Sequence, residues 1–190
     1  MMEKWIEERL IETIGLERYK HSLGVMNTAI ELAEIYGVDI EKARKAGLLH
    51  DCAKFKDQIN LLKMAYDFDI ILDSVMEHNI QLLHGPIGSK IAEVEYNIKD
   101  RDVLDAIYYH TTGRERMTVL DKIIYIADYI EPGRNFKGVN EVRKLAYENL
   151  DKSILLAMDN TIKFVIDKGQ LIHLDTIKSR NYLKIRLKLE

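Results

Sequence analysis

The chain has 190 residues, of which 47% are hydrophobic, enough for one domain with a substantial core. Its 28 Lys and Arg residues nearly balance 31 Asp and Glu residues, which argues against a disordered chain and against a generic nucleic-acid-binding protein. A single cysteine, Cys52, cannot form an intramolecular disulfide. The longest hydrophobic runs, 123–127 and 154–158, are too short to span a membrane, and the charged N-terminus lacks a signal-peptide pattern. We therefore expect a cytoplasmic protein without a membrane partner.

Few prolines and glycines, together with regularly spaced hydrophobic residues, predict an all-α bundle. Residues 16–36 are hydrophobic on two faces, which is typical of a central helix, and Gly37 is a suitable stop. Asp39 is a suitable N-cap for a helix that continues to Phe55. Further helices are predicted at 57–67, 70–78, 86–96, 100–110, 117–130 and 139–168. Residues 131–138 are predicted to form a loop, and the last residues a surface helix.

Four residues on these helices indicate a possible metal site. His50 lies on the inward face of its helix, and Asp51 can reach the same centre. Asp128 lies in a strongly hydrophobic segment, where an unpaired buried carboxylate would cost several kcal/mol. It therefore requires a cation, which is either an Arg or Lys side chain or a metal ion. Together with His21, these side chains provide nitrogen and oxygen ligands for a transition-metal ion.

Such an ion would polarise a phosphoryl oxygen and lower the pKa of water. In the alternative interpretation, Asp128 pairs with Lys or Arg and both histidines are neutral core residues. The spacing of the residues favours neither interpretation strongly.

Five longer motifs occur in the chain: RYKHSL (18–23), AGLLHDCAKF (46–55), LLHGPIGS (82–89), YHTTGR (109–114) and KIIYIADYIEPGR (122–134). Together they resemble the YqeK family of HD-domain metallophosphohydrolases, although that family usually has Tyr where this chain has Cys52. The resemblance covers about residues 16–150 and, more thinly, the tail. It implies a single HD domain over 1–190, with a core at about 16–150 and a C-terminal helical extension at 151–190. It further implies a homodimer that hydrolyses diadenosine tetraphosphate symmetrically to two ADP.

The resemblance also implies roles for individual residues. The ligands of a bound iron, or of manganese, zinc or cobalt instead, would be His21, His50, Asp51 and Asp128. His84 and His110 would line the phosphate channel as catalytic residues, one of them protonating the leaving ADP oxygen, or would bind a second divalent ion. In the alternative interpretation, both are merely exposed histidines at helix ends.

Several further residues are candidates for binding the nucleotide or its phosphates: Arg18, Lys54, Thr111 and Arg134. Arg134 follows the Asp128 helix directly and is well placed to bind phosphate through its guanidinium. Any of these cations can instead be a solvated surface charge. Four more residues are expected to be structural: His78, His173, Tyr108 and Tyr109, although a base could stack on one of the tyrosine rings.

Two other functions fit the same residues. The first is another HD phosphohydrolase, acting on nucleotides or on (p)ppGpp, which a substrate panel would distinguish. The second is a non-catalytic metal- or nucleotide-binding regulator, or a helical interaction module that docks through its basic tail. A solvated basic edge is the simpler interpretation of that tail.

Overall fold

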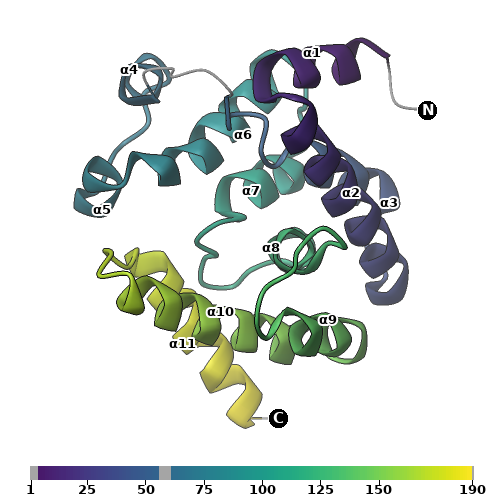
Figure 1. The fold of residues 1–190 in the computed structure, drawn as a ribbon, viewed down its shortest axis with the longest axis vertical. Helices are drawn as coiled ribbons and strands as arrows, with labels where there is room; N and C mark the ends of the chain where they lie inside the picture. Colours follow the sequence, from purple (N-terminus) through teal and green to yellow (C-terminus); the bar gives the residue numbers. More distant parts are fainter. Residues whose placement is uncertain (1–3, 56–60, 190) are drawn as a thin grey trace.

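The structure is a computed structural model that describes residues 4–55 and 61–189. All regular secondary structure within these residues is helical, which confirms the predicted all-α class (Figure 1). The helices are α1 (Lys4–Ile14), α2 (Leu16–Tyr36), α3 (Ile40–Leu49), α4 (Leu61–Asp67), α5 (Ser74–His78), the 3-10 helix η1 (Ile80–Leu83), α6 (His84–Val94), α7 (Arg101–Tyr109), α8 (Val119–Ile130), α9 (Val139–Glu148), α10 (Leu150–Asp167) and α11 (Leu174–Leu189). Across the described part of the chain, no helix combines the length and apolar character that crossing a bilayer requires.

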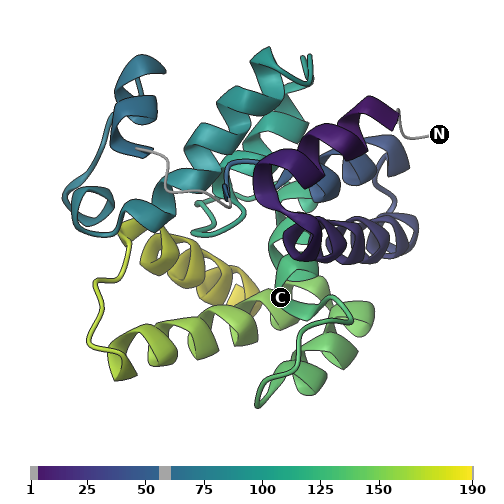
Figure 2. The same ribbon diagram turned by 45° about the horizontal axis from the view of Figure 1, so that its top comes forward.

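Helix α8 lies at the centre of the bundle and packs against α2, α3, α7 and α10 (Figures 1 and 2). Its hydrophobic side chains are buried around most of its circumference. A capping box starts the helix: the Thr118 hydroxyl accepts from the Asp121 N–H, and the Asp121 carboxylate accepts from the Thr118 N–H. Because Asp128 lies in the last turn of α8, this central helix carries its carboxylate to the middle of the fold.

Of the two helices that precede the HD motif, α2 ends and α3 begins as predicted. Helix α2 stops at Gly37, which has a φ of 69°, and the Asp39 side chain caps α3. The prediction that this second helix continues to Phe55 is wrong, because α3 ends at Leu49 and a turn follows. A continuous helix would separate the directions of two successive side chains by about 100°. The turn instead lets residues 50 and 51 face the same centre.

Three other predicted boundaries differ from the structure. Helix α5 fills only the second half of 70–78, because the Asp73 side chain accepts from two backbone N–H groups and starts the helix there. The predicted helix 139–168 is broken at Asn149, whose side chain caps α10. Helix α6 begins two residues before Pro86, which is tolerated in a first turn because its missing N–H has no partner there.

The remaining predicted elements agree more closely with the structure. Helix α4 confirms the end of the predicted helix 57–67, whose first residues lie outside the described ones. Helices α7 and α8 match their predicted ranges to within two residues, 131–138 contain no helix, and the chain ends in helix α11.

Close packing between α2 and α3 depends on Gly47. A Cβ atom at this position would lie 2.8 Å from the Cα of Met26 and 3.2 Å from its backbone N. These are backbone atoms, so no side-chain rotation could relieve the contact and the helices would have to separate. Because α2 carries His21 and α3 leads into His50, this spacing also controls how closely the two imidazoles approach.

We predict that Gly47→Ala lowers the free energy of unfolding by about 1–3 kcal/mol, the usual cost of overpacking. Gly88→Ala is the matched control, because the nearest described neighbour of its Cβ would be the Cys52 Sγ atom, at 3.5 Å. That variant should be neutral or up to about 1 kcal/mol more stable, since alanine favours a helix over glycine. Urea denaturation measures both values, and equal stabilities for the two variants would contradict the packing argument.

Candidate metal centre

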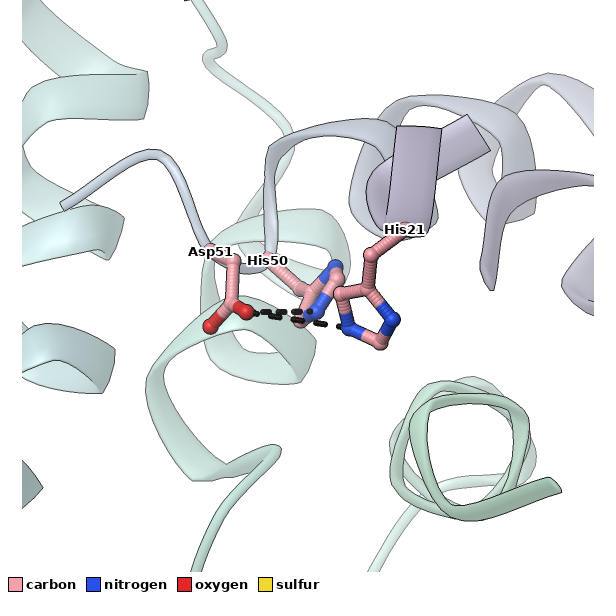
Figure 3. A group of neighbouring side chains, drawn as sticks. All are labelled: His21, His50 and Asp51. Carbon is pink, nitrogen blue, oxygen red and sulfur yellow. Dashed lines mark ion pairs between the residues drawn. The ribbon is translucent and has the colours of Figure 1, made fainter. Parts of the chain in front are cut away.

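Side chains from separate parts of the chain converge on the carboxylate of Asp51, which is 2% exposed. Its Oδ2 atom lies 3.3 Å from His50 Nε2 and 3.7 Å from His21 Nε2 (Figure 3). Its Oδ1 atom lies 3.4 Å from His84 Nε2 and 3.5 Å from His110 Nε2. Each carboxylate oxygen therefore faces one pair of imidazoles.

One local arrangement holds three of these imidazoles. His50, His84 and His110 are the C-caps of α3, η1 and α7, respectively. The Nδ1 atom of each faces the backbone carbonyl three residues earlier, at 2.7 Å for His50 and His110. The last carbonyls of an α-helix lack the intrahelical N–H donor four residues later, so they can accept from a side-chain Nδ1–H. This assigns the proton to Nδ1 and leaves on Nε2 a lone pair directed towards Asp51.

The fourth imidazole, His21, is oriented by Glu131, a buried residue that was not among the sequence-predicted site residues. His21 Nδ1 lies 3.1 Å from Glu131 Oε1, and Glu131 Oε2 accepts from the Gly133 N–H at 2.6 Å. A Cβ atom at Gly24 would lie 2.6 Å from Glu131 Oε2, so glycine leaves room for the carboxylate there. The sequence signal that could have identified Glu131 was its spacing from Asp128, which it follows by three residues, or almost one helical turn.

Asp128 lies at the edge of the cluster and is paired with Arg134. Its Oδ1 atom lies 3.0 Å from His21 Nε2, 3.8 Å from His50 Nε2 and 2.5 Å from Arg134 Nη2. The Asp128 side chain is 24% exposed, so it is less buried than its hydrophobic segment predicts. The alternative in which a guanidinium pairs with this carboxylate is thus realised in the structure. The case for a metal therefore depends on the imidazoles and on Asp51.

Those groups fit a metal ion through the lone pairs that they leave unpaired. Among the described residues, His21 Nε2, His50 Nε2 and Asp51 Oδ1 are buried without a hydrogen-bond partner. In the neutral form with Nδ1 protonated, a lone pair on His21 or His50 faces carboxylate oxygens, and this contact is repulsive. Burial opposes protonation of His50, but the neighbouring Asp51 and Asp128 carboxylates outweigh it and raise the pKa of His50. A metal ion between them would convert every one of these atoms into a ligand.

The second pair of imidazoles has the same property. His84 Nε2 and His110 Nε2 lie 3.0 Å apart, and the Thr111 hydroxyl lies 3.1 Å from both. That hydroxyl can donate its one proton to only one of the two nitrogen atoms. The donor atoms of His84, His110 and Asp51 all lie within 4.8 Å of one another, as do those of His21, His50 and Asp51.

Burial and neighbouring charges set the protonation states of the cluster. Burial opposes ionisation of Asp51, but contacts with His50 and His110 outweigh it and hold the pKa of Asp51 well below its usual value. The pKa of Asp128 is also lowered, because its imidazole neighbours outweigh the effect of burial. Burial, reinforced by His110, lowers the pKa of His84 to about 3. Ionised carboxylates and neutral imidazoles are the forms that bind metal ions.

Two cations reach Asp51 from different segments. Arg18 Nη1 lies 3.0 Å from Asp51 Oδ2, and Lys54 Nζ lies 3.9 Å from Oδ1. Because α3 ends at Leu49, Lys54 does not lie on the same helix, where the predicted continuation to Phe55 would place it. Lys54 instead belongs to the following turn, in which its N–H donates to the Asp51 carbonyl at 2.9 Å. Arg18, Lys54 and Arg134 therefore surround the cluster with positive charge.

Two residues near these elements have structural environments. His78 is exposed, and its Nδ1 lies 2.7 Å from the Ser74 carbonyl oxygen, as expected for a structural histidine. Cys52 is buried, its Sγ contacts the Gly88 carbonyl oxygen at 3.4 Å, and burial raises the pKa of its thiol. A thiol that stays protonated is a poor nucleophile and a poor metal ligand.

Comparison with known proteins agrees with this fold and cluster. Residues 18–133 match the HD domain family. A crystal structure of a predicted HD superfamily hydrolase involved in NAD metabolism, from Clostridium acetobutylicum, is 52% identical, with a TM-score of 0.93 over 98% of this chain and 100% of the other. The chain therefore belongs to the HD-domain family.

Two curated relatives define its group more narrowly. The Bacillus subtilis protein is 45% identical over 166 residues, which cover 87% of this chain and 89% of the relative. The Staphylococcus aureus protein is 43% identical over 173 residues, which cover 90% and 89%. Both are named symmetrical bis(5′-nucleosyl)-tetraphosphatase. This chain belongs to their family, and the resemblance to YqeK is confirmed.

We predict that Glu131→Gln weakens metal binding at least about 10-fold, because a carboxyamide is a weaker acceptor for the His21 Nδ1–H. Competition with a chelator measures the affinity without any assay of activity. Glu17→Gln is the control, since the Glu17 side chain is 86% exposed and pairs with Lys20. Equal affinity for both variants would show that Glu131 does not orient a ligand.

Proposed function

We propose that this chain is a metal-dependent hydrolase that cleaves diadenosine tetraphosphate symmetrically into two ADP. The observation that carries the proposal is its 43–45% identity, over nearly the full length of both chains, to proteins named for symmetrical bis(5′-nucleosyl)-tetraphosphatase activity. The donor atoms around Asp51 support it, because metal ions are common catalysts of phosphoryl-group hydrolysis.

In this proposal the cluster would hold two ions, and Asp51 would serve as a ligand residue in both sets of donors. Its Oδ2 atom faces one imidazole pair and its Oδ1 atom faces the other, which supports that role. The proposed ligands besides Asp51 are His21, His50 and Asp128 for the first ion, and His84 and His110 for the second.

His84 and His110 are thereby proposed as ligands rather than as proton donors. A pKa of about 3 leaves His84 neutral at neutral pH, and its one ring proton, on Nδ1, faces the Gln81 carbonyl oxygen. Its Nε2 atom also points at His110 and Asp51 within a buried cluster. The leaving ADP oxygen would then take its proton from water, so that water supplies both the new P–O bond and the proton.

The cations of the chain bind the phosphates in this proposal. When bound, ions of this class polarise phosphoryl oxygens and lower the pKa of water. A cavity of about 520 Å³ lies beside His21, and its lining includes Arg18, Lys20 and Arg134. One guanidinium group can bind two phosphate oxygens at once, which fixes the orientation of the phosphate and compensates its charge. Lys54 and the Thr111 hydroxyl border the other imidazole pair and would contact phosphate from that side.

We propose iron as the ion and a homodimer as the assembly, as the family resemblance implies. Imidazole and carboxylate donors suit iron, manganese, zinc and cobalt, so elemental analysis of the purified protein is the direct test. We also propose that residues 1–190 act as one domain, because α10 packs against the central helix α8 and α11 packs against α10. Analytical ultracentrifugation tests the dimer.

We predict that the metal-loaded chain converts diadenosine tetraphosphate into ADP alone, as followed by anion-exchange chromatography. Release of AMP together with ATP would overturn symmetrical cleavage. Faster turnover of (p)ppGpp than of diadenosine tetraphosphate would instead favour a different HD phosphohydrolase.

We expect His50→Ala to lower kcat at least about 100-fold, because it removes a proposed metal ligand and leaves the negative charge of the neighbouring carboxylates less compensated. His78→Ala removes an exposed histidine of the same size and should retain activity within about 2-fold. Retention of activity by the His50 variant would rule out this cluster as the catalytic centre.

A further inference from the structure

Two residues of the candidate site lie in the loop 131–138, which joins α8 to α9 (Figure 1). Glu131 contacts the His21 imidazole. Arg134 contacts the Asp128 carboxylate and lines the cavity beside His21. Loops are in general more mobile than the helices that they connect. The positions of these two residues therefore depend on contacts that the rest of the fold makes with this loop.

The guanidinium of Arg143, on α9, makes such contacts with the backbone of the loop. Its Nε atom donates to the Ile130 carbonyl oxygen at 2.8 Å. Its Nη2 atom donates to the carbonyl oxygens of Glu131 and Arg134, at 3.2 and 3.0 Å. Carbonyls at the end of a helix lack intrahelical donors, and a cation is favourable there. One side chain thus holds the end of α8 and both site residues of the loop.

These contacts leave the Arg143 guanidinium little capacity for a ligand. A guanidinium carries five N–H donors in a planar fork with fixed directions. The Nη1 atom of Arg143 donates to the Asn140 side-chain oxygen on the same helix, so all three nitrogen atoms have acceptors. Arg143 also lies outside the described lining of the cavity beside His21. Any effect of Arg143 on ligand binding is therefore expected to act through the loop.

Helix α9 is a firm support for this side chain, because it packs against α2 and α8. The Tyr36 hydroxyl of α2 donates to the Ala146 carbonyl oxygen of α9 at 2.7 Å. The Tyr147 hydroxyl of α9 donates to the Glu31 carboxylate of α2 at 2.6 Å. Helix α2 also carries His21. Arg143 therefore connects the loop to the helix that holds one imidazole of the cluster.

We propose that Arg143 is a positioning residue that orders the loop in advance, with Arg134 placed to bind phosphate and Glu131 placed to orient His21. This inference rests on the proposed function, in which Arg134 binds phosphate. A loop that is already ordered spares ligand binding the entropic cost of ordering it. Arg143 lies outside the five motifs that indicate the function, so the sequence gave no sign of this role.

Arg143→Lys tests the role, because it keeps the positive charge but replaces the planar fork with a single ammonium group. In calorimetry with the metal-loaded protein, this variant should bind inorganic pyrophosphate about 10-fold more weakly than the wild type. Lys144→Gln is the matched control on the same helix, since the Lys144 side chain is 81% exposed, and its affinity should stay within about 2-fold. Unchanged affinity in Arg143→Lys would overturn the proposal.

A double-mutant cycle with Arg134→Met separates positioning from a purely structural role. If Arg143 acts through Arg134, Arg143→Lys should weaken pyrophosphate binding no more than about 2-fold in the Arg134→Met background. A loss of about 10-fold in both backgrounds would show that the two arginines act independently, and would reject the positioning role.

Hydrogen exchange in the wild-type protein avoids any folding defect in a variant. The Arg134 N–H donates to the Glu131 carbonyl oxygen at 2.8 Å, and the Gly133 N–H donates to the Glu131 carboxylate at 2.6 Å. In a loop that is ordered in advance, these amides should exchange within about 3-fold of the same rate with and without pyrophosphate. Slowing of about 10-fold or more on pyrophosphate binding would mean that the ligand orders the loop, contrary to the proposal.

Hydrolysis of diadenosine tetraphosphate by the same wild-type preparation tests the proposed function separately. Activity together with unchanged pyrophosphate affinity in Arg143→Lys would leave the proposed function in place and reject the role of Arg143. Absence of activity together with the expected affinities would reject the proposed function and support the role of Arg143 in positioning an anion-binding arginine.

Discussion

The fold is organised around a buried carboxylate that faces four imidazole nitrogens. An isolated ionised carboxylate in a protein core is strongly unfavourable, so Asp51 can be ionised there only because cations or hydrogen-bond donors surround it. Helices α2, α3, α7 and α8 and the 3-10 helix η1 each supply or position one partner. The central place of α8 and the close approach of α2 and α3 at Gly47 bring these partners together.

Helix ends supply the orientation of the imidazoles. Three histidines occupy C-cap positions, and the Nδ1 atom of each contacts the backbone carbonyl oxygen three residues earlier. The same hydrogen bond fixes the tautomer and directs Nε2 inwards, so one local arrangement serves both folding and ligand geometry. His173, outside the cluster, has the opposite tautomer, with its proton on Nε2.

Sequence patterns were sufficient for the helical class and for most of the cluster. Hydrophobic periodicity predicts helices well, and the motifs around His21, His50 and Asp128 directed attention to residues that the structure brings together. The turn after Leu49 was missed because a buried helix and a buried turn share the same hydrophobic composition. Asn149 was missed because a single asparagine that caps the next helix looks like any polar residue within a long one.

The partners of the cluster could not be predicted, because they depend on contacts between distant segments. Glu131 contacts His21 across 110 residues, and Arg18 contacts Asp51 across 33. Metal content is the most direct test of the central proposal that Asp51 and the imidazoles around it hold two metal ions. The wild-type chain, purified with metal present, should contain about two ions, and a folded Asp51→Asn variant should retain almost none. One ion or fewer in the wild type, or an unchanged content in the variant, would contradict the account.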